Sequence, residues 1–182
     1  MYNYPNSVEL IDKIFNIYIT PNEIEAVIQR IADKINEDYA GKSPVFLTIL
    51  NGAVIFATDL IRNINLDCEI EFLSAKSYGK AMESSGKVEL QHYGLDLKDK
   101  DVIIVEDIVD TGHTLTNLLK NISQFEPKSV RCASLLSKPA MRQVEVKVDY
   151  IGIEIDPIFV VGYGLDYASK GRQLPAIYKL AE

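Results

Sequence analysis

Hydrophobic residues follow two alternating patterns along this chain. Short runs rich in β-branched residues are typical of strands buried on both faces. Five such runs occur, at residues 45–50, 68–75, 102–105, 129–136 and 150–155. The segments between several of them carry apolar residues three or four positions apart, which is the spacing of a helix with one buried face.

The clearest helical segment covers about residues 20–41. Thr20 and Glu23 have the spacing of a capping box at its start. Two further helices are predicted at about 52–64 and 114–125. Because strands separated by helices form parallel sheets with right-handed crossovers, the pattern predicts an α/β fold with helices on both faces of the sheet.

Three carboxylates and a short turn follow the strand predicted at 102–105. Glu106, Asp107 and Asp110 lie within five positions, and carboxylates about 5 Å apart repel by roughly 3 kcal/mol at an effective dielectric constant near 20. Thr-Gly-His-Thr at 111–114 then leads into a helix N-terminus, whose free N–H groups bind anions. This combination is typical of a sugar-phosphate site. The alternative is a solvated strand end at which Asp110 caps the helix.

Two more polar segments fall at strand ends. Asn51 and Gly52 follow the first run, and Lys138 follows the run at 129–136. Ligands of parallel sheets bind beyond the carboxyl ends of the strands, so these residues and the acidic cluster are predicted to share one site. The Gly- and Ser-rich stretch at 74–91 is either a mobile lid or a disordered hairpin.

Residues 102–114 resemble the phosphoribosyl-diphosphate motif of the type I phosphoribosyltransferases, two acidic residues after a hydrophobic strand and then D-T-G-x-T. Three other segments extend the resemblance to the 6-oxopurine branch, the hypoxanthine or hypoxanthine-guanine phosphoribosyltransferases. They are K-S-Y-G at 76–79, Lys138-Pro139, and F-V-V-G-Y-G-L-D-Y at 159–167. The resemblance reaches from about residue 44 to residue 178.

The resemblance implies a fold as well. It is the type I phosphoribosyltransferase fold, an α/β twisted parallel sheet flanked by helices with a small hood subdomain. Residues 1–182 would form one domain. Its core would cover about 8–150, and its hood would come from the N-terminal segment and about 151–182.

The activity that the resemblance implies is Mg²⁺-dependent transfer of ribose 5-phosphate from 5-phosphoribosyl 1-diphosphate to hypoxanthine, and to guanine. IMP or GMP and diphosphate would be the products, in purine salvage. The alternatives are a regulator of the same fold that senses phosphoribosyl diphosphate, a xanthine or pyrimidine phosphoribosyltransferase, and a receiver-type acidic pocket. The turn at 111–114 and the segment 159–167 fit the receiver type poorly, and Asp110 and Lys138 count against a pure sensor.

The resemblance also assigns roles around the purine. Asp110 would be the catalytic residue, exchanging the proton on N7 of the purine. Lys138 would donate to the 6-oxo group and so reject adenine. Phe159 would stack on the ring, the backbone of Val160 would contact its edge, and Asp166 would lie near the purine and the metal-bound water.

The remaining roles concern the sugar, the phosphates and the metal. Glu106 and Asp107 would bind the ribose hydroxyls, and the 5′-phosphate would bind to Thr111, Gly112, His113 and Thr114. The diphosphate would bind to Asn51, Gly52, Ser77, Tyr78 and Arg172. Mg²⁺ would be held by Glu106, Asp107 and Asp166, partly through water.

Two of these residues depart from the family pattern. Asn51 stands where the family usually has Lys or Arg, and His113 where it often has Lys or Asn. We therefore expect the loop at Asn51 to act through its peptide N–H groups and magnesium. In the family the peptide bond before this residue can be cis, so a cis bond is predicted between Leu50 and Asn51.

Composition narrows the remaining possibilities. A formal net charge of −7 argues against a nucleic-acid-binding surface but not against a locally positive site for an anion. No apolar run has the length of a membrane span and no signal peptide is evident, so a cytoplasmic protein is expected. Cys68 and Cys132 lie outside any Cys/His array and are expected to be reduced thiols. The family is usually dimeric or tetrameric, which predicts a homodimer or homotetramer.

Overall fold

The computed structural model describes residues 4–74 and 95–181. Ser77 and Tyr78, the stretch expected to form a lid or hairpin, and the K-S-Y-G segment lie outside the described residues.

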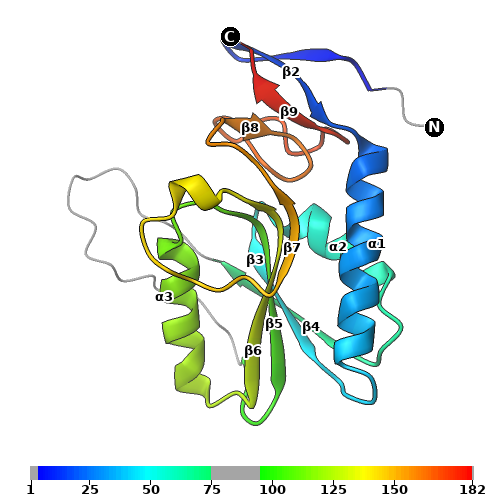
Figure 1. The fold of residues 1–182 in the computed structure, drawn as a ribbon, viewed down its shortest axis with the longest axis vertical. Helices are drawn as coiled ribbons and strands as arrows, with labels where there is room; N and C mark the ends of the chain where they lie inside the picture. The colour runs from blue at the N-terminus through cyan, green and yellow to red at the C-terminus, as the bar shows by residue number, and fades with distance from the viewer. Residues whose placement is uncertain (1–3, 75–94, 182) are drawn as a thin grey trace.

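A five-stranded parallel sheet forms the larger part of the molecule (Figure 1). Its strand order is β4-β3-β5-β6-β7, and every neighbouring pair is parallel, which confirms the predicted α/β fold. The strands are β3 Val45–Leu50, β4 Glu69–Ser74, β5 Asp101–Val109, β6 Ser129–Ser137 and β7 Tyr150–Glu154.

Helices cover both faces of this sheet. Figure 1 shows α1 (Pro21–Asp38) and α2 (Val54–Arg62) on one face and α3 (His113–Ile122) on the other. Each face has its own hydrophobic core, one around α1 and α2 and one around α3. Two short 3-10 turns, η1 (Ser123–Phe125) and η2 (Pro139–Met141), follow α3 and β6.

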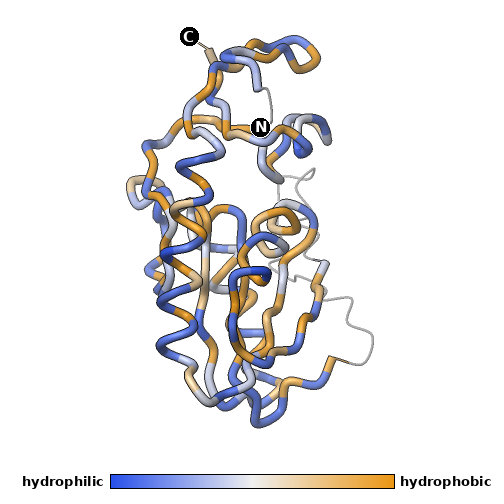
Figure 2. The backbone as a smooth tube through the Cα atoms, turned by 90° about the vertical axis from the view of Figure 1, so that its right-hand side faces the viewer, coloured by the Kyte–Doolittle hydropathy of each residue, from blue (hydrophilic) through white to orange (hydrophobic). Residues whose placement is uncertain are grey.

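The first helix begins as predicted. Both hydrogen bonds of the capping box between Thr20 and Glu23 are present, which satisfies N–H groups that a helix start leaves unpaired. Its isoleucines at positions 24, 28, 31 and 35 are buried. Figure 2 shows hydrophobic and hydrophilic stretches alternating along the backbone of the whole molecule. Burying the isoleucine stripe holds α1 against the sheet.

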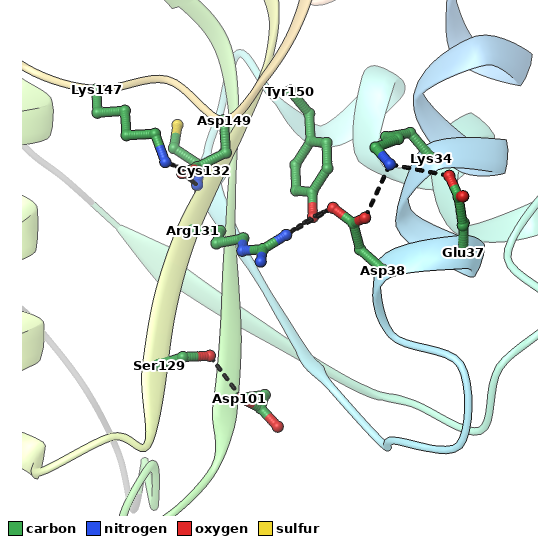
Figure 3. Close-up of polar contacts among 10 residues, drawn as sticks. All are labelled: Lys34, Glu37, Asp38, Asp101, Ser129, Arg131, Cys132, Lys147, Asp149 and Tyr150. Atoms are coloured by element: carbon green, nitrogen blue, oxygen red, sulfur yellow. Dashed lines mark hydrogen bonds and ion pairs between the residues drawn. The ribbon is translucent and has the colours of Figure 1, made fainter.

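A polar network fixes the C-terminal end of α1 to the sheet (Figure 3). Nη1 of Arg131, on β6, donates to Asp38 Oδ2 and to the hydroxyl oxygen of Tyr150, each at 2.6 Å. Lys34 Nζ pairs with the other oxygen of Asp38 at 3.0 Å. The Tyr150 hydroxyl donates to Asp38 Oδ2 as well, at 2.9 Å. Because the Asp38 carboxylate accepts from three side chains, this network orients α1 as well as attaching it.

A second, antiparallel sheet lies beyond the carboxyl edge of the first (Figure 1). It has the order β1-β2-β9-β8 and combines β1 Ser7–Leu10 and β2 Lys13–Ile19 with β8 Val160–Val161 and β9 Ile177–Leu180. The two ends of the chain therefore meet in one sheet. A small core around Phe15, Val161, Ala176 and Tyr178 fills one side of it.

None of the helices in residues 4–74 and 95–181 has the length and apolar character that crossing a bilayer requires. Both cysteines are free, with Cys132 buried and Cys68 partly exposed.

Candidate active site

The central strand β5 is longer than the sequence pattern predicted. The prediction ended the strand at residue 105 and placed the acidic cluster after it, but Glu106 and Asp107 lie within β5, which continues to Val109. Pairing with β3 stops at Thr48 and Val105, whereas pairing with β6 continues to Val109 and Ser137. Asp107 and Ile108 are half-buried and Val109 is buried, and the pairing with β6 carries the strand past the two acids.

Placement within a strand buries the first of these carboxylates. Glu106 is only 6% exposed. Burial raises the pKa of Glu106 well above its ordinary value, and the nearby Asp107 raises it further. Burial also raises the pKa of Asp107, against the lowering effects of backbone N–H hydrogen bonds and, to a smaller extent, of Arg172. A buried carboxyl group followed directly by a half-buried one is costly to fold, which favours a ligand that hydrogen-bonds to both or neutralises them.

Gly52 allows a close approach between β3 and β5. A Cβ atom on Gly52 would lie 1.6 Å from Asp107 Oδ2, so no larger residue fits beside this carboxylate. A Cβ on Gly164, which follows β8, would lie 2.0 Å from the carbonyl oxygen of Gly52. Gly52 is therefore enclosed between a carboxylate and the loop from the small sheet, while Asn51 is exposed. The predicted cis peptide bond between Leu50 and Asn51 is present.

The turn predicted to bind phosphate lines a cavity. The cavity has a volume of about 200 Å³ and is bounded by Glu106, Ile108, Val109, Asp110, Thr111, Gly112, Thr114 and Leu115. Gly112 is the N-cap of α3, has a φ of +90° and makes no side-chain cap hydrogen bond. The alternative in which Asp110 caps this helix is therefore wrong. The first-turn N–H groups of α3 have no side-chain cap, and residues of this turn line the cavity, an arrangement that suits an anion.

His113 is the first residue of α3, and its side chain is exposed. Its Nε2 is 3.1 Å from Gln143 Oε1. Backbone N–H groups of Gln143 and Val144 donate to the carbonyl oxygen of Thr111 at 3.0 and 3.3 Å. The segment after η2 thus supports the outer side of the turn.

Asp110 and Lys138 are brought together from two strand ends. Lys138 Nζ lies 3.3 Å from Asp110 Oδ2, and the Lys138 side chain is 10% exposed. The other oxygen, Asp110 Oδ1, is buried and has no hydrogen-bond partner. An unpartnered buried acceptor beside an ammonium group is a recognition element for a ligand that carries both a donor and an acceptor.

The small sheet supplies an exposed aromatic side chain. Phe159 is 48% exposed, while its neighbour Val160 is buried. The Phe159 ring contacts Phe15 and Tyr167, with ring centroids 6.2 and 6.0 Å apart. Tyr167 is in turn held by a hydrogen bond from its hydroxyl to Asp12 Oδ1 at 2.8 Å. Phe159 therefore has a fixed ring with a free surface, as stacking on a planar ligand requires.

Asp166 and Arg172 form an ion pair on the same loop. Arg172 Nη2 lies 2.7 Å from Asp166 Oδ1, and Arg172 Nη1 donates to the carbonyl oxygen of Gly164 at 2.6 Å. Arg172 and Asp166 both act on the pKa of Asp107, in opposite directions. This loop therefore brings one cation and one carboxylate near the acids of β5.

Among residues 4–74 and 95–181, no three His, Cys, Asp or Glu side chains are grouped so as to hold a metal ion. The available donors are carboxylate oxygens, the ligands that Mg²⁺ prefers, and Mg²⁺ commonly binds through one or two carboxylates with water and substrate phosphates completing its shell. The donor set fits an ion shared with a substrate.

Three residues of the site were missed by the sequence analysis. Arg142 donates to the carbonyl oxygen of Asp110, and Tyr163 donates from its hydroxyl to Asp59 at 2.5 Å. The only local signal for Arg142 is a basic residue four positions after Lys138. Tyr163 and Asp59 are separated by 104 positions, and nothing in the local pattern links them.

Comparison with known proteins places the chain in a family. Residues 16–168 match the model of the phosphoribosyl transferase domain. The hypoxanthine phosphoribosyltransferase of Escherichia coli K12 is 41% identical over 90% of this chain and 94% of its own length. A hypoxanthine-guanine phosphoribosyltransferase structure from Bacillus anthracis is 36% identical with a TM-score of 0.85, covering 93% of this chain and 99% of its own.

A longer relative contains the same unit. The bifunctional protein TilS/HprT of Listeria monocytogenes is 38% identical over 90% of this chain, but the chain spans only 26% of that protein's length. The family model covers most of the chain, and the single-unit relatives match it over nearly their whole length. The chain belongs to the phosphoribosyl transferase family, in its hypoxanthine and hypoxanthine-guanine phosphoribosyltransferase branch.

Proposed function

We propose that this protein transfers ribose 5-phosphate from 5-phosphoribosyl 1-diphosphate to hypoxanthine and guanine, releasing diphosphate and giving IMP and GMP in purine salvage. The observation that carries the proposal is the pair of Asp110 and Lys138, 3.3 Å apart, with Asp110 Oδ1 buried and unpartnered. The similarity to the E. coli hypoxanthine phosphoribosyltransferase supports it independently.

The sugar-phosphate half of the substrate would occupy the cavity at the end of β5. Glu106 and Asp107 would accept hydrogen bonds from the ribose hydroxyls, which offsets part of the cost of burying two carboxyl groups. The 5′-phosphate would bind the backbone N–H groups at 111–114, where Gly112 leaves the start of α3 without a side-chain cap. Thr111 and Thr114 would add hydroxyl donors, and His113 would contribute its backbone.

The purine would lie between Lys138 and Phe159. The Lys138 ammonium donates to a 6-oxo group, whereas the 6-amino group of adenine would face it with donors of its own. Asp110 would accept the proton that leaves N7 as the glycosidic bond forms. Phe159 would stack on the ring, and the backbone of Val160 would contact its edge.

The diphosphate would lie near residues 51–52 and Arg172. Peptide N–H groups of Asn51 and Gly52 would bind its oxygens, with Ser77 and Tyr78 contributing from the part of the chain outside the described residues. Mg²⁺ would bind through one or two of the carboxylates of Glu106, Asp107 and Asp166, since the three are not grouped as a ready-made metal site, and water and substrate phosphates would complete its shell. When bound, the ion would neutralise charge on the leaving diphosphate.

We also propose the organisation that accompanies this activity. Residues 1–182 would form one phosphoribosyltransferase domain whose hood is built from the N-terminal segment and about residues 151–182. The active protein would be a cytoplasmic homodimer or homotetramer that binds neither nucleic acid nor membranes. The net charge of −7 supports the absence of a nucleic-acid partner.

The test is a spectrophotometric assay with phosphoribosyl diphosphate and Mg²⁺, supplying hypoxanthine, guanine, xanthine, adenine and uracil in separate reactions. We expect turnover of hypoxanthine and guanine and none of adenine. Asp110→Asn should lower kcat by about 10²–10⁴-fold, because an amide cannot accept the N7 proton. It should lower the thermal unfolding temperature modestly, because it leaves the buried Lys138 ammonium group without its carboxylate partner, so kcat is compared well below that temperature.

The assay also separates the alternatives. Tight binding of phosphoribosyl diphosphate without turnover of any base would contradict the enzyme and favour a sensor of that compound. Preferred turnover of xanthine or uracil would retain the enzyme but overturn the proposed substrate. Equal turnover by the Asp110→Asn variant would remove Asp110 from the catalytic role.

A further inference from the structure

Arg142 joins the ends of two strands of the large sheet. Its Nη1 donates to the backbone carbonyl oxygen of Asp110 at 2.5 Å, and its Nη2 donates to Ser137 Oγ at 3.0 Å. Val109 and Ser137 are the last paired residues of β5 and β6. The guanidinium group therefore connects the carboxyl ends of β5 and β6, where the backbone pairing of the two strands stops.

The two strand ends that Arg142 connects carry the two residues proposed to contact the purine. Asp110 follows β5 and Lys138 follows β6, and their charged groups lie 3.3 Å apart. The backbone N–H of Lys138 donates to the carbonyl oxygen of Val109 at 3.0 Å. Ser137 is 1% exposed, so its hydroxyl offers a fixed acceptor inside the protein. Movement at either strand end would change the spacing of the carboxylate and the ammonium group.

We infer that Arg142 is a positioning residue that sets the spacing between the Asp110 carboxylate and the Lys138 ammonium group, and through it how both groups meet a 6-oxopurine. The inference rests on the proposed function, because it assigns no contact between Arg142 and substrate. A guanidinium group is a planar fork that donates to two acceptors in fixed geometry. A lysine at this position would keep the charge but lose the fork.

Other contacts hold the neighbouring phosphate turn. The carbonyl oxygen of Thr111 accepts from the backbone N–H groups of Gln143 and Val144, and the His113 ring contacts the Gln143 side chain. None of these contacts uses the Arg142 side chain. Loss of the fork should therefore disturb the purine half of the site more than the phosphate half.

The test compares two ligands by titration calorimetry. IMP occupies both halves of the site, and ribose 5-phosphate occupies only the sugar-phosphate half. For Arg142→Gln and for Arg142→Lys we expect IMP to bind about tenfold more weakly, as the loss of one hydrogen bond near a buried acceptor implies. The affinity for ribose 5-phosphate should stay close to that of the wild type. Ser137→Ala removes the acceptor of one arm of the fork with little change in volume, and it too should weaken IMP binding while leaving the affinity for ribose 5-phosphate close to that of the wild type.

A matched control separates positioning from general stability. Arg30, on α1, likewise donates to two acceptors, here both backbone carbonyl oxygens, those of Ile151 at 3.3 Å and Gly152 at 2.6 Å. Arg30→Gln removes the same kind of contact away from the candidate site. We expect it to lower the unfolding temperature and to leave the ratio of the two affinities unchanged.

Each outcome decides between the readings. Equal loss of affinity for both ligands in Arg142→Gln would make Arg142 a purely structural residue and overturn the inference. Full IMP affinity in Arg142→Lys would show that charge alone suffices, which overturns it as well. If Arg142→Gln does not fold, Arg142→Lys and Ser137→Ala decide. A wild-type protein that binds neither ligand would instead overturn the proposed function, and the inference with it.

Discussion

Glu106 carries a carboxyl group whose burial raises its pKa in the folded protein well above the ordinary value of 4.5. The folded state therefore holds this proton more tightly than the unfolded chain, and stability falls as pH rises from that value through the raised pKa. Glu106→Gln removes the cost of a buried charge. At mildly alkaline pH we expect its unfolding temperature to exceed that of the wild type by roughly 2–4 °C, the shift that 1 kcal/mol produces in a protein of this size.

The pH dependence of the unfolding temperature and the activity of the Glu106→Gln variant test this prediction further. The difference should shrink as the pH falls through and below 4.5, where the wild-type carboxyl group becomes protonated in both states. The variant should also lose activity, because an amide is a weaker acceptor for a ribose hydroxyl than a carboxylate. Glu25→Gln on the exposed face of α1 is the control and should show neither effect. A Glu106→Gln variant less stable than the wild type at alkaline pH would show that the buried carboxylate stabilises the fold.

At the scale of elements, the sequence pattern predicts the long, buried helices and strands and misses the short strands. The capping box at Thr20 and the apolar run at 45–50 were predictable because helix spacing and β-branched runs are local signals. The full length of β5 was not predictable from the sequence. Its last four residues, 106–109, are part of the strand because they pair with β6, and their own hydrophobic pattern does not indicate a strand. β1 and β8 have four and two residues, too few to show a period.

The same limit applies to the candidate site. Asp110 and Lys138 could be brought together from the sequence, because the ends of parallel strands meet at one edge. The contact between Arg142 and Asp110 could not be predicted from the sequence, because the two residues are 32 positions apart and no helix or strand fixes the distance between them. Local pattern therefore predicts residues at strand ends, and it fails for residues that reach them from irregular segments.

The start of α3 depends on one glycine. Gly112 has a φ of +90°, and a Cβ there would lie 2.9 Å from the carbonyl oxygen of Val144. Gly112→Ala adds about 1–2 kcal/mol of backbone strain and a clash with a segment that supports the turn. We expect the variant to lose affinity for ribose 5-phosphate in calorimetry and to unfold at a lower temperature.

Gly41 provides the matched control for this change. Its φ is +73°, but a Cβ there would meet nothing within 4 Å. Gly41→Ala should therefore carry the strain without the clash, lowering the unfolding temperature while ribose 5-phosphate binds as before. If both variants bind the ligand equally well, the turn tolerates displacement and close packing against Val144 is not what shapes it.

At the scale of the whole molecule, the candidate site is divided between two sheets. The acids and the phosphate turn belong to the large parallel sheet, whereas Phe159 and the loop with Asp166 and Arg172 belong to the small antiparallel one. Backbone contact between Gly164 and Gly52 leaves no room for a side chain at their junction. The relative placement of the sheets therefore decides whether the two halves of the site meet the same substrate.

Tyr163 makes a side-chain contact that holds these sheets together, through the hydrogen bond from its hydroxyl to Asp59 on α2 at 2.5 Å. Tyr163→Phe should lower the free energy of unfolding by about 1–2 kcal/mol and raise KM for phosphoribosyl diphosphate several-fold, because the loop with Asp166 and Arg172 loses an anchor. Tyr178→Phe is the control, since that hydroxyl donates to Pro5 O at 3.0 Å beside the small sheet. It should lower stability without changing KM. Equal KM values in both variants would mean that the backbone contact of Gly164 alone fixes the junction of the sheets.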